Sequence, residues 1–166
     1  MLRAHRMIES KDIARLFDLH APAVFRRCRR LLGNNADAEE AVQEIFVRVV
    51  RAGHTFQHQS QLTTWLYQIT TNFCLNQLRD RKRQRELGEA KLKPMESAVQ
   101  QPTADALTEV RRLLARADPK QAEAAAYVFL DGMSHDEAAQ VMNVSRRTVG
   151  NLIERFNAWA TGGEPS

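Results

Sequence analysis

The chain has 166 residues, 43% of them hydrophobic and 27% charged, with a formal net charge of +4. This length suits one or two small domains with modest hydrophobic cores. No apolar run approaches the roughly 20 residues that span a bilayer. The two cysteines, Cys28 and Cys74, lie far apart in sequence and form no C-x-x-C pair, so neither a zinc knuckle nor a disulfide framework is suggested. We therefore expect a cytoplasmic protein without membrane insertion, metal or cofactor.

The charge is unevenly distributed along the chain. Residues 1–93 hold 17 basic and 10 acidic residues, a net +7, whereas residues 94–166 hold 7 basic and 10 acidic residues, a net −3. Phosphate-binding charge is therefore expected mainly in the first part. Any DNA binding by the second part must depend on where its few basic side chains lie.

The N-terminal third predicts two helices. Apolar residues at helical spacing indicate one helix over 10–32, with a joint at Pro22 where a new helix starts. A second helix is expected over 36–52, because acidic residues favour the positive end of a helix dipole. Asp37, Glu40, Gln43 and Glu44 would share one face of it, and the apolar residues Val42, Ile45, Phe46, Val49 and Val50 would pack inward.

Residues 54–61 predict a polar loop, and residues 62–85 predict one long helix. A Trp at helical spacing, here Trp65, usually lies in a core, so a core role competes with a role in binding. Asn72, Asn76, Arg79 and Arg83 follow at steps of four, three and four residues, which places them on one face. We expect the loop residues His54 and His58 to be solvated, because no cysteine accompanies them.

Residues 87–103 lose this periodicity and predict a linker, after which helices are expected over 104–117 and 119–130. Ser134 and Glu137 have capping-box spacing and predict a further helix start. Asn143 would end that helix and Ser145 would begin the next one. The spacing of the apolar residues around this turn predicts a helix-turn-helix.

Four short motifs occur in order along the chain: Asp37-Ala38-Glu39-Glu40, Gln43-Glu44, Thr64-Trp65-Leu66-Tyr67 and Thr148-Val149. In these motifs the chain resembles the extracytoplasmic-function sigma factors of bacterial RNA polymerase. This resemblance implies two small helical domains in an all-α fold: a region 2-like domain at 1–86 and a region 4-like domain at 104–166, joined by the linker at 87–103. It implies a non-enzymatic subunit that directs core polymerase to promoter DNA. An anti-sigma protein would mask the two domains until a signal arrives.

The resemblance also implies three binding surfaces. Core polymerase would contact Asp37, Glu40, Gln43, Glu44 and Phe46. The promoter −10 element would contact Gln57, Gln59, Ser60, Gln61, Thr64, Trp65, Asn72, Asn76, Arg79 and Arg83. The −35 element would contact Ser145, Arg146, Arg147, Thr148, Asn151 and Arg155.

The chain departs from this family pattern at several positions, and a different function remains open. Asn76 stands where an aspartate is common, and Gly150 stands where a basic residue is common. The alternative is a helix-turn-helix regulator that binds DNA without polymerase, although it leaves the acidic face and the Trp65 helix unexplained. The motifs of phosphate-binding loops, metalloproteases and nucleophile elbows are absent from the sequence, which argues against an enzyme.

Overall fold

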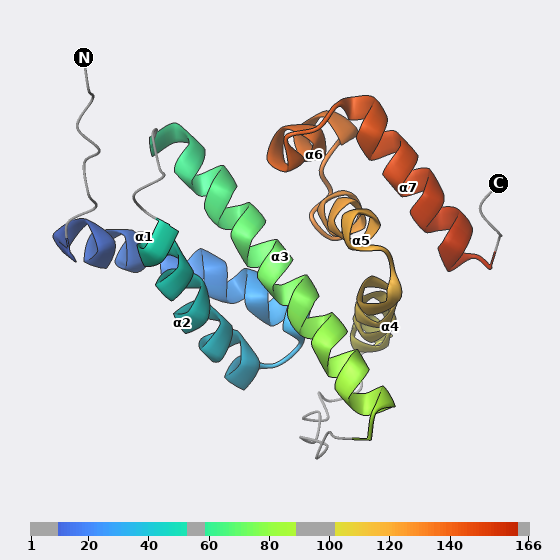
Figure 1. Ribbon diagram of the computed structural model, residues 1–166, viewed down its shortest axis with the longest axis horizontal. Coiled ribbons are helices and arrows are strands. Elements are labelled where there is room, and N and C mark those ends of the chain that lie inside the picture. The colour runs from blue at the N-terminus through green and yellow to red at the C-terminus, as the bar shows by residue number, and fades with distance from the viewer. Residues whose placement is uncertain (1–9, 53–58, 89–101, 163–166) are drawn as a thin grey trace. The chain divides into compact units, whose positions relative to one another are not determined.

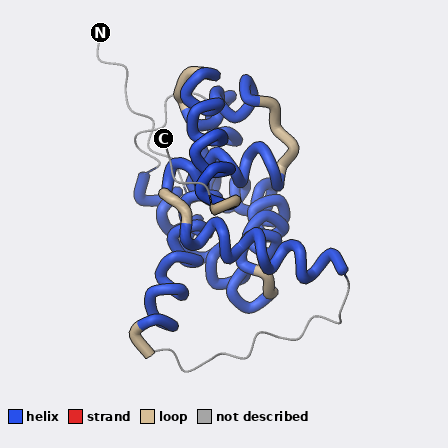
Figure 2. The backbone as a smooth tube through the Cα atoms, turned by 90° about the vertical axis from the view of Figure 1, so that its right-hand side faces the viewer, coloured by secondary structure: helices blue, strands red, loops and turns tan. Residues whose placement is uncertain are grey.

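The computed structural model describes residues 10–52, 59–88 and 102–162. Within these ranges every regular element is a helix (Figure 1), which confirms the predicted all-α fold. Figure 2 shows the same helices in blue, with tan loops and turns where the connections are described. The chain divides into two compact units, Met1–Thr70 and Thr71–Ser166, and the boundary between them lies inside the long helix α3 (Gln59–Glu86).

In the first unit, α1 (Ser10–Leu32) and α2 (Asn35–Ala52) pack against each other as a helical hairpin (Figure 1). Gly33 joins them with a φ of 90°, a conformation that glycine adopts without steric cost. The side-chain oxygen of Asn34 accepts a hydrogen bond of 2.9 Å from the backbone N–H of Asp37. This bond satisfies one of the unpaired donors at the start of α2, so the chain reverses within two residues.

The core of the hairpin consists of apolar residues three or four positions apart, as helical periodicity requires. Val50 was predicted to belong to this core, but it is 46% exposed. It follows the buried Val49 by one residue, which turns it about 100° around the helix axis. The buried apolar residues of the hairpin are Val24, Cys28, Leu31 and Leu32 in α1, and Ala38, Ala41, Val42, Ile45, Phe46 and Val49 in α2.

The predicted joint at Pro22 is wrong, because α1 continues through this residue without a break. Proline inside a helix removes one backbone donor and crowds the carbonyl four residues earlier, which here belongs to Asp18. Both Pro22 and Asp18 are exposed. Water is therefore able to replace the missing donor on this side of the helix, and the helix tolerates the proline.

The long helix α3 begins at Gln59, three residues before the predicted start at Leu62. Part of the predicted polar loop is thus the first helical turn, which is compatible with the good helix propensity of glutamine. Up to Thr70, α3 belongs to the first unit. There the guanidinium carbon of Arg27 in α1 lies 3.8 Å from the centroid of the Tyr67 ring, a cation–π contact.

The second unit contains the rest of α3, α4 (Pro102–Arg116), α5 (Pro119–Ala125), α6 (His135–Met142) and α7 (Arg146–Ala160). The helix α5 continues directly into a π-helical segment, Ala126–Leu130. Both α5 and α6 pack on α7, and small side chains allow close approach. The buried residues of α5 to α7 are Ala122, Glu123, Ala124, Ala125, Ala126, Tyr127, Ala138, Ala139, Met142, Val149, Ile153 and Phe156.

The helix ends around α6 confirm the predicted capping signals. The backbone N–H of Glu137 donates to the Ser134 hydroxyl at 3.2 Å, and the backbone N–H of Ser134 donates to the Glu137 carboxylate at 2.7 Å. Asn143 ends α6 with a φ of 53°, in the left-handed region. The Ser145 hydroxyl then accepts the backbone N–H of Thr148 at 3.1 Å and caps α7. These local bonds form the helix-turn-helix.

Candidate protein-binding and nucleic-acid-binding surfaces

The acidic face of α2 is open to solvent. Glu40, Gln43 and Glu44 are exposed, and they lie at helical steps that place them together. Asp37 belongs to the same face but is half-buried, and its carboxylate accepts a hydrogen bond from the amide of Asn34. Asp37 therefore also supports the turn between α1 and α2, and the three exposed residues are the ones available to a partner.

An apolar hollow of about 380 Å³ adjoins this acidic face. Phe46, predicted beside the carboxylates, is only 5% exposed and forms part of the hollow's wall. Its ring meets the ring of Phe17 in α1 edge to face, with centroids 4.8 Å apart. The complete lining is Phe17, Gln43, Phe46, Val47, Val50 and Arg51.

Three of the lining side chains leave much of their apolar surface in water: Phe17 is 42% exposed, Val47 42% and Val50 46%. Sequence analysis missed this hollow, because its two walls come from different helices. The available signal was Val47 and Val50, which lie three residues apart and therefore share one face of α2. A face that combines carboxylates with exposed apolar surface suits a protein partner.

A second predicted surface lies along α3. Gln57 is outside the described residues, while Gln59, Ser60 and Gln61 form the first turn of the helix. Thr64 is exposed and Trp65 is half-buried, so Trp65 is neither a full core residue nor a free one. Five of the predicted residues share one side of this continuous helix by their spacing: Trp65, Asn72, Asn76, Arg79 and Arg83.

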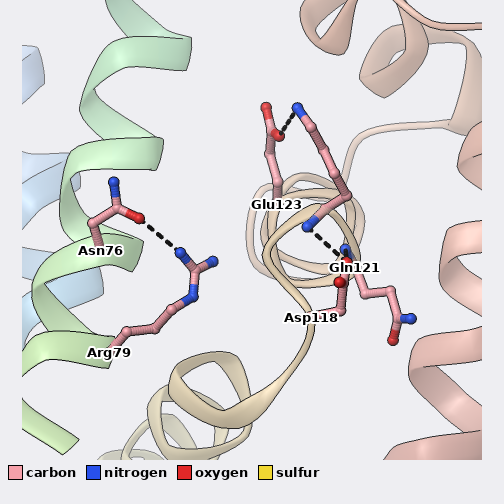
Figure 3. A network of polar contacts seen from close by, with 6 residues as sticks. Asn76, Arg79, Asp118, Gln121 and Glu123 are labelled. Atoms are coloured by element: carbon pink, nitrogen blue, oxygen red, sulfur yellow. Dashed lines mark hydrogen bonds and ion pairs between the residues drawn. The ribbon is translucent and has the colours of Figure 1, made fainter. Parts of the chain in front are cut away.

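The basic end of α3 is arranged by contacts within the helix. The guanidinium of Arg79 donates to the side-chain oxygen of Asn76 at 2.7 Å (Figure 3). Arg83 pairs with Asp80 at 3.0 Å, and Lys82 pairs with Glu86 at 3.2 Å. Burial lowers the pKa of Arg79, against the opposing effect of nearby carboxylates. The ridge therefore presents amide and guanidinium donors of the kind that bind phosphate and bases.

The third surface is the N-terminal end of α7. Arg146, Arg147 and Thr148 are exposed there, and Asn151 and Arg155 are exposed on the following turns. The hydroxyl of Ser145, besides capping the helix, lies 2.8 Å from the Thr148 hydroxyl. Both hydroxyls are thus partly engaged in the cap, so the guanidinium and amide groups are the more available donors.

Acidic groups of α6 lie next to this end of α7. Asp136 approaches the guanidinium of Arg146 to 3.8 Å, and both side chains are largely exposed. The pKa of Glu137 is lowered by the backbone N–H of Ser134 and, to a lesser extent, by its hydroxyl. Glu137 is therefore held as a carboxylate in the cap. The local charge near α7 is mixed, in keeping with the acidic balance of the second part of the sequence.

A further group of aromatic side chains lies in the second unit, and sequence analysis did not identify it. Phe129 in the π-helical segment is 53% exposed, and its ring centroid is 6.1 Å from that of Phe156. The ring centroid of Phe156 is in turn 5.9 Å from that of Trp159.

In the described part of the chain, no cluster of three or more potential ligands could hold a metal ion. Within the same ranges, no helix is long and apolar enough to cross a membrane.

Comparison with known proteins finds two family models that match the chain. The family model "Sigma-70 region 2" matches residues 16–84, and "Sigma-70, region 4" matches residues 107–155. The ECF RNA polymerase sigma factor SigW of Bacillus subtilis is 33% identical over 69 residues, covering 42% of this chain and 37% of SigW. The corresponding SigM of Mycobacterium tuberculosis is 25% identical over 158 residues, covering 95% of this chain and 80% of SigM.

A solved structure shares the fold. It is the sigma factor RpoE in complex with the anti-sigma factor NepR from Bartonella quintana, with a TM-score of 0.52 and 22% identity. The similarity covers 89% of this chain and 92% of that one.

Proposed function

Because the chain belongs to the extracytoplasmic-function group of sigma-70 factors, we propose that it directs bacterial RNA polymerase core to a specific set of promoters. It works as a region 2-like domain at 1–86, a linker at 87–103 and a region 4-like domain at 104–166. The chain spans only 37% of SigW but 80% of SigM. Its residues bind and position macromolecules and perform no chemistry of their own, and it acts in the cytoplasm.

Core polymerase binds the face of α2. The observation that carries this assignment is the juxtaposition of Glu40, Gln43 and Glu44 with an open apolar hollow of about 380 Å³. The carboxylates suit a basic partner surface, and burial of Val47 and Val50 would add apolar contact area. Asp37 and Phe46 support this surface from beneath, since one holds the interhelical turn and the other forms the wall of the hollow.

Promoter DNA binds two other surfaces. The N-terminal end of α7 enters the major groove of the −35 element, where Arg147 and Asn151 reach base edges and Arg146 and Arg155 reach phosphates. The beginning of α3, with the residues before it, holds an unpaired base of the −10 element. Base flipping costs a few kcal/mol, which a fitted pocket offsets. Asn72, Asn76, Arg79 and Arg83 then guide the displaced strand.

An anti-sigma protein is a further proposed partner, because RpoE of Bartonella quintana has the same fold and was solved with such a protein. The competing function is a helix-turn-helix regulator that binds duplex DNA alone. Such a regulator has no use for the acidic face and apolar hollow of α2, so the sigma factor function is preferred.

The test is a competition between single-stranded non-template −10 oligonucleotides that differ at one base, with and without core polymerase. We expect sequence-selective retention only when core is present. Substitution of Gln59, Ser60 and Gln61 should change the preferred base. Tight binding of duplex operator by the chain alone, without retention of the single strand by the holoenzyme, would favour the regulator.

A further inference from the structure

Two arginines on the same ridge of α3 have different hydrogen-bond acceptors. Nη1 of Arg79 donates to the amide oxygen of Asn76 at 2.7 Å, and Nη2 of Arg83 donates to the carboxylate of Asp80 at 3.0 Å. Each acceptor lies three residues before its arginine. The two pairs thus have the same helical spacing and similar geometry, but Asn76 is neutral and Asp80 is negatively charged.

The two acidic residues near the C-terminal end of α3, Asp80 and Glu86, form ion pairs with cations other than Arg79. Asp80 pairs with Arg83, and Glu86 pairs with Lys82. A phosphate that approaches Arg83 must compete with the carboxylate of Asp80 and is repelled by it. At Arg79 the acceptor is an amide, which neither neutralises the guanidinium nor repels phosphate.

Other carboxylates also act on Arg79 at longer range. The negative charges of Asp118, Asp80 and Glu123 favour its charged form, in that order. Asp118 caps α5, and Glu123 forms an ion pair of 3.0 Å with Lys120 (Figure 3). No hydrogen bond joins Arg79 to a carboxylate within the described residues. Asp118 and Glu123 lie outside α3, so substitutions within α3 leave both carboxylates in place.

The contact between Asn76 and Arg79 also fixes an orientation. A guanidinium only donates hydrogen bonds, so the amide of Asn76 must turn its oxygen toward Arg79 and its NH₂ group away. The Nε atom of Arg79 is buried and has no hydrogen-bond partner in the described structure. The hydrogen bond to Asn76 thus holds the outer end of the side chain, which reduces the ordering needed when a ligand binds.

We propose that Asn76 is a positioning residue for Arg79, and that Arg79 rather than Arg83 is the principal phosphate-binding cation of the ridge formed by Asn72, Asn76, Arg79 and Arg83. Asn76 acts through Arg79 and need not touch the DNA. This inference rests on the proposed function, because the phosphate is that of the non-template strand near the −10 element.

The experiment exchanges the two acceptors in full-length chain assembled with core polymerase. Retention of the single-stranded −10 oligonucleotide is measured over a range of salt concentrations. Asn76→Asp should reduce affinity about two- to fivefold and make the slope of log affinity against log salt shallower by about 0.7, the value for one phosphate on a single strand. Asp80→Asn should have the opposite effect on both quantities.

Asn76→Ala separates positioning from charge. It keeps the charge of Arg79 but removes its acceptor, so affinity should fall while the salt slope stays unchanged, and Asn76→Gln should restore part of the affinity. Helical circular dichroism identifies any variant that fails to fold, in which case Arg79→Gln and Arg83→Gln are compared instead, and the Arg79 change should be the more damaging.

The outcomes separate this inference from the proposed function. If wild-type holoenzyme does not retain the oligonucleotide, the proposed function fails and the inference fails with it. If wild type retains it but Asn76→Asp leaves affinity and slope unchanged, or Arg83→Gln is more damaging than Arg79→Gln, the inference alone is overturned.

Discussion

The exposed face of α2 and the N-terminal end of α7 both carry charge, but they differ in what surrounds it. The carboxylates of α2 adjoin an apolar hollow, whereas the first turns of α7 expose arginines, a threonine and an asparagine. Protein interfaces need apolar surface to bury, and DNA contacts need donors directed at phosphates and base edges. The surroundings of a charge therefore indicate the class of its partner better than the charge itself.

The largest expected effect comes from reversing charge on the α2 face. The double substitution Glu40→Lys with Glu44→Lys should abolish detectable binding to core polymerase while leaving the helical circular-dichroism signal intact, because both side chains are exposed. Glu39→Lys is the matched control, since Glu39 is also exposed but points about 100° away from Glu40. Undiminished core binding by the folded double variant would refute the assignment of this face.

The next effect concerns α7. Arg147→Ala should weaken transcription from the cognate promoter and remove about 1–3 kcal/mol of discrimination at one upstream position, if the guanidinium contacts a base. Promoter variants that differ at single upstream base pairs provide the measurement. An equal loss on every variant would make Arg147 a phosphate contact and would leave base reading to other residues of the helix.

A smaller effect should distinguish the apolar part of the α2 surface from its carboxylates. Val47→Ser with Val50→Ser should weaken core binding by about fivefold, since each side chain has roughly half its surface left to bury. This loss should persist at high salt, where charge interactions are screened. Leu19→Ser is the control, because Leu19 is 71% exposed and does not line the hollow. Equal losses in the control and the double variant would remove the hollow from the interface.

The smallest effect concerns the capping box of α6. Ser134→Ala should lower the free energy of unfolding by about 1 kcal/mol. The pKa of Glu137 is lowered in the folded chain, so its stabilising contribution is present above the pKa of an unfolded glutamate and is lost as pH falls through the folded value. Glu137→Gln should therefore weaken the acid dependence of urea unfolding. An unchanged dependence would show that the cap does not contribute to it.

Local signals in the sequence predicted the helix-turn-helix well. The capping box at Ser134 and Glu137, the left-handed Asn143 and the cap at Ser145 each depend on residues within a few positions of one another. The hollow beside α2 could not be predicted in this way, because it exists only where Phe17 meets Phe46 across two helices. Likewise, the sequence placed Arg79 and Arg83 on one ridge, but only the side-chain contacts distinguish their acceptors.

The start of α3 was missed for a different reason. Gln59, Ser60 and Gln61 are polar, and a run of polar residues predicts a loop, although glutamine is a good helix former. The break predicted at Pro22 does not occur, because the exposed position of this residue leaves the affected carbonyl accessible to water. For Pro22, the solvent exposure of the residue, which the sequence does not state, decided the structure.

The π-helical segment Ala126–Leu130 has a consequence for how this fold can change over evolution. Its closing bond runs from the backbone N–H of Asp131 to the carbonyl of Ala126, five residues back, at 3.2 Å. Compared with an α-helix, such a turn accommodates one additional residue, which rotates everything that follows by about 100°. The segment is therefore equivalent to an α-helical turn with one residue inserted. Related chains that gained or lost that residue could keep the helix unbroken while presenting Phe129, and the helices that follow it, at a different angle.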